Sequence, residues 1–401
     1  MKNIQKLTVL TALALPAFAM AADNAKPEAP KAVVTAIAQG QSQDRSYMND
    51  FAGVKPVLTT YDETTQKESK MRYVKSEIIK GIVHYAMAPE GAAEGGEMLI
   101  PANRTGIKFT YKPEGDLAIK IKDAIFSGNN EAAIGMMRKG IYPLIQLVAA
   151  PESLMAIQND VINFTDLLMA AGRVNEAYAI MMSLDYAKIK PQFSAQAVKL
   201  IGELTKLGRY NDALKLADKL SFEGEFAVLI PDFLDALDTI RNAGKIKEVS
   251  RWYAKLQSLK ENPDKLACTL WMLYCDISSG NLVSAKVFVK STTIKNIDRK
   301  SPVFSLAQMI KGMLLTTSKQ YKEALENFSE GIIYGKPTDQ WMAELTYNTA
   351  LCYKQINKPQ VAKEIFEELG LFYPNSVFNK QAKAQIALIE KEAKAAQAQE
   401  E

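Results

Sequence analysis

At residues 171–177 the chain reads Ala-Gly-Arg-Val-Asn-Glu-Ala, and two later stretches repeat this phrase. They read Leu-Gly-Arg-Tyr-Asn-Asp-Ala at 207–213 and Ala-Gly-Lys-Ile-Lys-Glu-Val at 243–249. The glycine returns every 36 residues, at 172, 208, 244 and 280. A fixed period of this size is the signature of a repeat array. The sequence therefore predicts a solenoid, in which stacked units share one continuous apolar core.

The first residues are predicted to be an export signal rather than part of the fold. Lys2 and Lys6 precede an apolar run at 7–17, and Ala19-Met20-Ala21 provides a small-residue cleavage site. This order is typical of a secretory signal peptide at residues 1–21. We expect an exported protein that is periplasmic or, alternatively, secreted. The formal charge of the chain is only +4, which argues against nucleic acid as a partner.

The remaining chain divides by composition and periodicity. Residues 22–70 are rich in Ala, Lys, Gln, Asp and Thr, and we expect a flexible linker there. Residues 71–115 contain β-rich runs at 73–79, 81–87, 98–100 and 107–111, which predict a small antiparallel meander or barrel. Residues 116–375 switch to helical periodicity. The last segment, 376–401, is expected to be a capping helix and tail.

Each predicted helix pair has a recurring residue at its turn. A left-handed residue often ends a helix, and glycine adopts this conformation most easily. We place such a residue after the first helix of each pair, at Gly128, Gly172, Gly208, Gly244, Gly280, Lys319 and Asn357. A small residue follows five positions later in each pair, which allows close approach of the two helices.

The stretch 343–374 has a small residue eighth, an aromatic eleventh, alanine twentieth, an aromatic twenty-fourth and proline thirty-second. These are Ala350, Tyr353, Ala362, Phe366 and Pro374. The pattern resembles the tetratricopeptide-repeat (TPR) family. The resemblance implies a mainly all-α fold, a right-handed α-solenoid of about seven TPR-like helix pairs. The preceding segment is similar to the small β modules of some exported bacterial proteins, through Ile100-Pro101, Ile107, Phe109 and Pro113-Glu114.

The resemblance also implies a binding surface. In TPR-like proteins the first helix of each pair lines a concave groove that holds peptides or partner helices. The corresponding positions are Asn159, Asp166, Thr205, Lys206, Asp238, Arg241, Asn242, Tyr347, Leu351 and Lys354. We therefore expect a protein–protein interaction scaffold of the cell envelope, with protein or peptide partners.

Catalytic and metal-binding patterns are sparse. His84 is the single histidine, and it lies in a predicted strand rather than beside a nucleophile. Cys268 and Cys275 are seven residues apart on one predicted helix, too far apart for a disulfide, and Cys352 falls two repeats later. We expect three free, mostly buried thiols, no cofactor, no metal site and no enzymatic activity.

An alternative function rests on a group of basic residues that follows Gly280. They are Lys286, Lys290, Lys295, Arg299 and Lys300. They suit either the solvated face of a helix and its loop or a patch for an anionic glycan or membrane surface. The alternative function is thus recognition of glycan or peptidoglycan. The pairs Met136-Met137 and Met181-Met182 suit buried packing or an adaptable binding surface.

Overall fold

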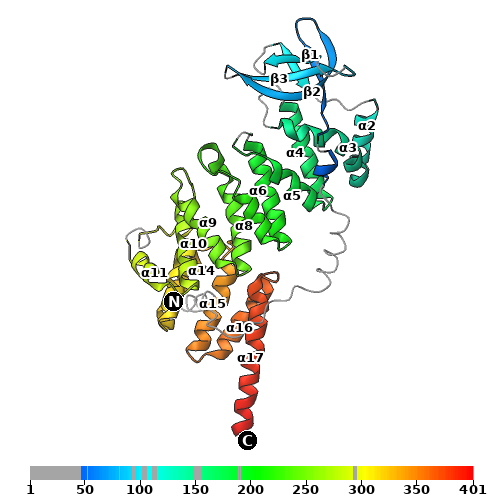
Figure 1. Cartoon of the computed structure of the whole chain (residues 1–401). Coiled ribbons are helices and arrows are strands. Elements are labelled where there is room, and N and C mark those ends of the chain that lie inside the picture. The colour runs from blue at the N-terminus through cyan, green and yellow to red at the C-terminus, as the bar shows by residue number, and fades with distance from the viewer. Residues whose placement is uncertain are drawn as a thin grey trace, which may run out of the picture. The chain divides into compact units, whose positions relative to one another are not determined.

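The computed structural model describes residues 47–51, 53–80, 82–92, 96–101, 106–110, 115–148, 155–187, 189, 191–291 and 296–400. The predicted signal peptide lies outside these residues, as does most of the predicted linker. The described chain is mainly helical with a small antiparallel sheet, as the sequence predicted (Figure 1). It divides into two compact units that meet between Ala236 and Leu237, and each is described separately.

The sheet belongs to the first unit and has five strands in the order β4-β3-β2-β1-β5. Their bounds are β1 Val57–Asp62, β2 Lys67–Ile79, β3 Ile82–Pro89, β4 Met98–Pro101 and β5 Ile107–Thr110. The first four strands form a meander of antiparallel neighbours. β5 then pairs with β1 on the opposite edge, with Thr59 opposite Thr110 and Asp62 opposite Ile107.

The sheet begins earlier than the predicted boundary at residue 71. β1 and the first part of β2 lie in residues that the composition assigned to the linker, 22–70. Their hairpin is set locally, since the Asp62 carboxylate accepts hydrogen bonds from the backbone N–H groups of Thr64 (2.9 Å) and Thr65 (3.1 Å). Threonine favours strands, but the first part of β2 consists of Lys, Glu and Ser residues, whose composition is that of a linker.

The helices follow in sequence order. In the first unit they are η1 Met48–Phe51, α2 Leu117–Phe126, α3 Asn130–Leu144, η2 Ile145–Leu147, α4 Met155–Ala170, α5 Val174–Ser183, α6 Pro191–Lys206, α7 Tyr210–Ala217 and η4 Gly224–Leu229. Helix α8, Ile230–Asn242, contains the boundary between the units. The second unit continues with α9 Ile246–Ser258, α10 Lys265–Ser278, α11 Leu282–Val289, α13 Phe304–Thr317, α14 Tyr321–Tyr334, α15 Met342–Gln355, α16 Pro359–Phe372 and α17 Val377–Glu400.

The same three-residue loop joins the two helices of each hairpin, at 127–129, 171–173, 207–209, 243–245, 279–281, 318–320 and 356–358. Its middle residue is left-handed every time, with φ between 59° and 82° for Gly128, Gly172, Gly208, Gly244, Gly280, Lys319 and Asn357. In the loop at Lys319, the N–H of Gln320 donates to Leu315 O (3.0 Å) and that of Lys319 to Thr316 O (2.9 Å). This is the Schellman arrangement, which satisfies carbonyls left open at a helix end. The prediction of left-handed residues at these positions is confirmed.

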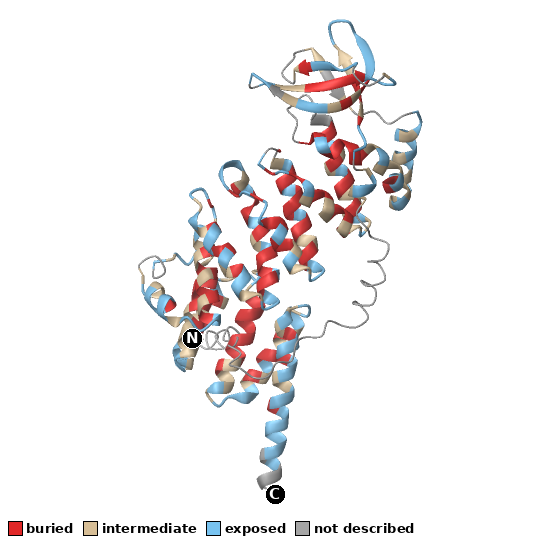
Figure 2. Cartoon of the chain, in the orientation of Figure 1, coloured by how far each residue is buried: buried red, intermediate tan, exposed pale blue. Residues whose placement is uncertain are grey.

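Buried residues lie where neighbouring helices meet (Figure 2). In the first unit Phe164 and Phe193 are fully buried, and in the second Trp252 and Phe328 have at most 1% exposure. Gly312 of α13 allows α14 to approach, because a Cβ at this position would overlap the ring of Phe328. Side chains of α15, α16 and α17 share one apolar cluster. Residues 391–395 of α17 are exposed, and the helix extends past the other helices of its unit (Figure 1).

Candidate functional site

A cleft of about 560 Å³ opens in the first unit between the start of the sheet and helices α2 and α3. Its walls come from three separate parts of the sequence. Val54, Lys55 and Pro56 precede the sheet, Val57, Thr59, Lys70 and Glu90 belong to its strands, and Leu117, Gly135, Met136, Lys139, Gly140 and Pro143 come from the helices. A cleft of this size with mainly apolar walls has the dimensions of ligand-binding sites in proteins.

The helical wall contains residues that are unusual inside a helix. Gly135 is exposed in the middle of the helix, and a Cβ at this position would meet no atom within 4 Å. Glycine in a helix interior costs about 1 kcal/mol relative to alanine. Gly140 and Pro143 follow on the same wall of the cleft. Packing does not require the glycine at 135, and its effect is to leave backbone bare on the cleft floor.

The opposite wall is held in place by hydrogen bonds and aromatic packing. The Gln146 side-chain amide donates both to Val54 O (3.2 Å) and to Pro143 O (2.8 Å). The ring of Phe51 stacks on Tyr142, with 5.1 Å between centroids. The segment before the sheet is therefore fixed to α3, and the cleft does not depend on a loose loop.

A buried ion pair supports this anchor. Arg138 donates from Nε and Nη2 to the two oxygens of Glu176 at 2.9 Å, and Tyr142 donates to the same carboxylate at 2.8 Å. The Glu176 side chain is fully buried. The Arg138 guanidinium lies 3.9 Å from the ring centre of Tyr47, just before η1. Because this bidentate pair is shielded from water, it ties α3 to α5 and holds the N-terminal wall.

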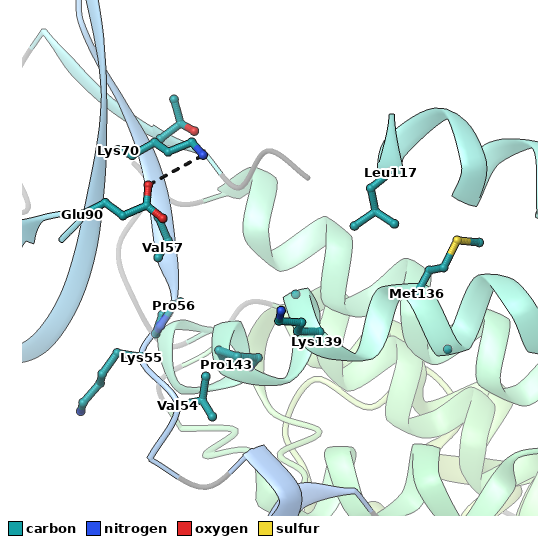
Figure 3. A pocket seen from close by; sticks show the side chains of 13 residues that line it. Val54, Lys55, Pro56, Val57, Lys70, Glu90, Leu117, Met136, Lys139 and Pro143 are labelled. Atoms are coloured by element: carbon teal, nitrogen blue, oxygen red, sulfur yellow. Dashed lines mark ion pairs between the residues drawn. The ribbon is translucent and has the colours of Figure 1, made fainter. Parts of the chain in front are cut away.

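The cleft has an excess of positive charge. Lys70 and Glu90 form an ion pair across 3.7 Å on the sheet side (Figure 3). Lys139 lies on the helical side between Met136 and Pro143, while Lys55 points away from it (Figure 3). Lys55 and Lys139 form no ion pair with any residue that the structure describes. The cleft therefore presents one available ammonium group in a lining that it shares with Met136, Leu117 and the backbone of Gly135.

Three of the groove residues expected from the sequence gather in a different place, in the second unit. Arg241 is 2% exposed and donates to Asp238 Oδ1 (2.6 Å) and Asn242 Oδ1 (3.2 Å). Its guanidinium lies 3.5 Å from the ring centre of Trp271. Asp238 also accepts from Tyr253 Oη (3.2 Å). Asp238 and Arg241 thus lie inside the helix packing, and Asn242 is exposed beside them.

Glu344 of α15 belongs to the same buried cluster. It is 5% exposed and accepts a hydrogen bond from Tyr274 Oη at 2.7 Å. Burial raises its pKa above the ordinary value, and the charge of Arg241 opposes this shift. Its second oxygen and Arg241 Nε have no hydrogen-bond partner among the described residues. The cluster is enclosed, so we assign it to the packing between helices rather than to a surface.

The other expected groove residues are dispersed. Asn159 is exposed, and Asp166 of α4 pairs with Lys199 of α6. Thr205 is buried and donates to Gly202 O (2.8 Å), while exposed Lys206 pairs with Glu203 (2.8 Å). None of these four belongs to the cleft beside the sheet.

The last three expected residues lie on α15, close to the C-terminal helix. Tyr347 is buried, with its ring 5.8 Å from that of Phe378 in α17. Leu351 packs against the same apolar cluster. Lys354 forms an ion pair with Glu392 of α17 across 3.6 Å. Helix α17 therefore covers the face of α15 where the resemblance implied a partner.

The cysteines, the histidine and the acidic residues show no arrangement for catalysis or metal binding within the described chain. Cys268, Cys275 and Cys352 are free and buried, as predicted, and burial raises their pKa values to about 11, 12 and 12. His84 is half-buried in β3 with Nδ1 3.0 Å from Ile82 O. No group of three or more His, Cys, Asp or Glu side chains in the described chain could hold a metal ion. Among the described helices, none combines the length and apolarity needed to cross a membrane.

Sequence reasoning named Met136 but missed the cleft around it. The available signal was Gly135 and Gly140 inside an otherwise helical pattern, since interior helix glycines often have a packing or functional reason. Comparison with known proteins adds no further residue: no protein-family model matches the chain, and no curated protein gives a significant match.

Proposed function

We propose that the protein is a non-enzymatic binding scaffold of the cell envelope, exported through a cleaved signal peptide to the periplasm. Its helical part would be a right-handed solenoid of about seven TPR-like pairs. Its ligand would be a peptide segment of a partner protein, bound in the cleft beside the sheet. The supporting observation is the fixed cleft whose floor is bare helix backbone at Gly135.

The lining of the cleft defines the chemistry of the peptide. Met136 offers a flexible, polarizable surface that adapts to different apolar side chains. Lys139 offers an ammonium group to a carboxylate on the same peptide. Gly135 lets a peptide backbone approach the helix more closely than any residue with a side chain would. We therefore expect an extended segment with an apolar residue beside an acidic one.

The test uses two substitutions at one position. Gly135→Ala adds a methyl group that meets no atom within 4 Å, and it should stabilise the exposed helix by about 1 kcal/mol. Gly135→Phe should fill the cleft. A photo-crosslinking residue at Met136 reports occupancy in intact cells, and a second one at Lys215, exposed on α7, controls for chance contacts.

We expect a protein adduct from position 136 that is weakened by Gly135→Ala, because its methyl group covers the bare backbone, and is lost with Gly135→Phe. Lys139→Gln should weaken the adduct, while folding, followed by circular dichroism, should stay unchanged. An adduct that contains only polysaccharide would favour the glycan alternative. Equal adducts from both Gly135 variants would refute the assignment of the cleft.

A further inference from the structure

Positive charge is concentrated in one section of the second unit. Residues 277–322 contain one acidic residue, Asp298, and eight basic ones: Lys286, Lys290, Lys295, Arg299, Lys300, Lys311, Lys319 and Lys322. This section has a formal charge of +7, whereas the whole chain has +4, so the rest of the chain is at −3. Lys295 lies outside the described residues. The near-neutral total therefore conceals a strongly basic region.

Three of these lysines surround a second cleft, of about 440 Å³, between α11, α13 and α14. Lys286 and Lys290 come from α11 and its C-terminal cap, and Lys311 comes from α13. Leu314 and Leu315 lie beside them in the lining, which includes no Asp or Glu among the described residues. The cleft thus combines ammonium groups with an apolar surface.

Lys311 is the least solvated of the three. It is half-buried, and burial lowers its pKa. The charge of Glu330 opposes this shift, but its carboxylate is already bonded to Arg299 (2.7 Å) and to Gln308 (2.7 Å). Within the described chain Lys311 forms no ion pair. A partly dehydrated ammonium group in such a place favours an anion supplied from outside the protein.

The outer face of α11 is unusually apolar for a surface. Val283 is 76% exposed and Val287 is 71% exposed. They are four residues apart, as are Lys286 and Lys290, so valines and lysines form two adjacent rows on one short helix. Exposed aliphatic side chains next to basic ones are typical of protein surfaces that rest on anionic membranes.

We propose that α11 and its cleft bind the surface of a membrane that contains anionic phospholipid. The lipid phosphate would lie between Lys286, Lys290 and Lys311, and Val283 and Val287 would enter the headgroup region. This site is separate from the peptide cleft, and neither proposal depends on the other. It would hold a scaffold against the membrane surface without a spanning segment.

The experiment measures flotation of the full chain with vesicles of phosphatidylcholine, with and without phosphatidylglycerol. We expect binding only to the anionic vesicles, decreasing as salt is added. A triple variant that combines Lys286→Gln, Lys290→Gln and Lys311→Met should abolish vesicle binding. We expect the affinity to fall about fivefold for each lysine, which corresponds to about 1 kcal/mol per basic residue near such a surface. A matched control neutralises three exposed lysines of the same unit, Lys380, Lys383 and Lys391.

The valines and Lys311 give two further readouts. Val283→Ser with Val287→Ser should weaken vesicle binding, while Val228→Ser, at a residue 72% exposed in the other unit, should not. Lys311→Met alone should raise the melting temperature while it weakens binding, because it removes a dehydrated charge. A residue with only a structural role would not show these opposite effects.

Three results would overturn the proposal. One is equal loss of vesicle binding in the lysine triple variant and its matched control, because only the total charge would then matter. Another is the absence of binding to anionic vesicles by the natural chain. The third is binding to polyglutamate but not to vesicles, which would assign the cleft to an acidic protein partner.

Discussion

Replacing Lys319 with glycine should stabilise the second unit. Lys319 adopts φ of 59° in the loop between α13 and α14, where five other hairpins have glycine. A residue with a Cβ loses roughly 1–2 kcal/mol in the left-handed region. Glycine removes this strain but gives the unfolded chain more freedom, at roughly 0.5–1 kcal/mol. The net gain should be about 0.5–1 kcal/mol, or a rise of about 2 °C in the melting temperature.

Control variants separate the backbone effect from the loss of a charge. Lys319→Ala removes the ammonium group but keeps a Cβ, so it should gain nothing at the loop. Asn357→Gly should change little, because asparagine tolerates the left-handed conformation observed there, with φ of 60°. Lys322→Gly, at an exposed position in the first turn of α14, should cost under about 1 kcal/mol.

The assay is thermal unfolding followed by circular dichroism at fixed protein concentration and salt. The informative quantity is the difference in melting temperature between Lys319→Gly and Lys319→Ala. If Lys319→Gly lowers the melting temperature as Lys322→Gly does, the left-handed strain is not relieved. The energetic account of these loops would then be refuted.

Three other substitutions test the packing and the buried charges. Gly312→Ala should cost about 1–3 kcal/mol, measured by urea unfolding, because its Cβ would collide with an aromatic ring of α14. Arg138→Met leaves the carboxylate of Glu176 buried without its partner and should cost about 3–5 kcal/mol, whereas Arg173→Met, which breaks a pair with a half-exposed carboxylate, should cost under about 1 kcal/mol. The pKa of Glu344 is raised in the folded chain. Its carboxyl group therefore contributes to stability fully below the pKa of the unfolded chain, and this contribution is lost as pH rises through the pKa of the folded chain. Glu344→Gln should therefore raise the melting temperature more at about pH 7 than at about pH 4, and a parallel shift at both would contradict this.

The sequence predicted the elements that repeat. The left-handed position between paired helices could be assigned even to Lys319 and Asn357, because a fixed interval identifies an equivalent residue without its usual chemistry. The first strand was missed because Thr59 and Thr60 provide little apolar contrast against a polar linker. Register with β2 and β5, which comes from distant residues, makes this segment a strand.

The candidate sites could be predicted only in part, for a related reason. Arg241 was expected to line a groove because its position corresponds to the groove positions of TPR-like proteins. In the structure Asp238 and Trp271 surround it instead. Trp271 is 30 residues further along the chain, so no local pattern in the sequence predicts this contact. The cleft beside the sheet needs residues near 55, 117 and 139 at once. No single stretch of sequence contains that information.

In a repeat protein, features that depart from the repeat have the strongest claim to a function. Stacking alone explains the loop residues and the small side chains that return in every hairpin. It does not explain an exposed helix-interior glycine at 135, which lowers helix stability without relieving any contact. It also does not explain Val283 and Val287, which α11 exposes beside lysines although burial would stabilise the array. Both features reduce stability where they occur, so selection for folding alone would not retain them. This shared cost is the physical reason to test these two places first.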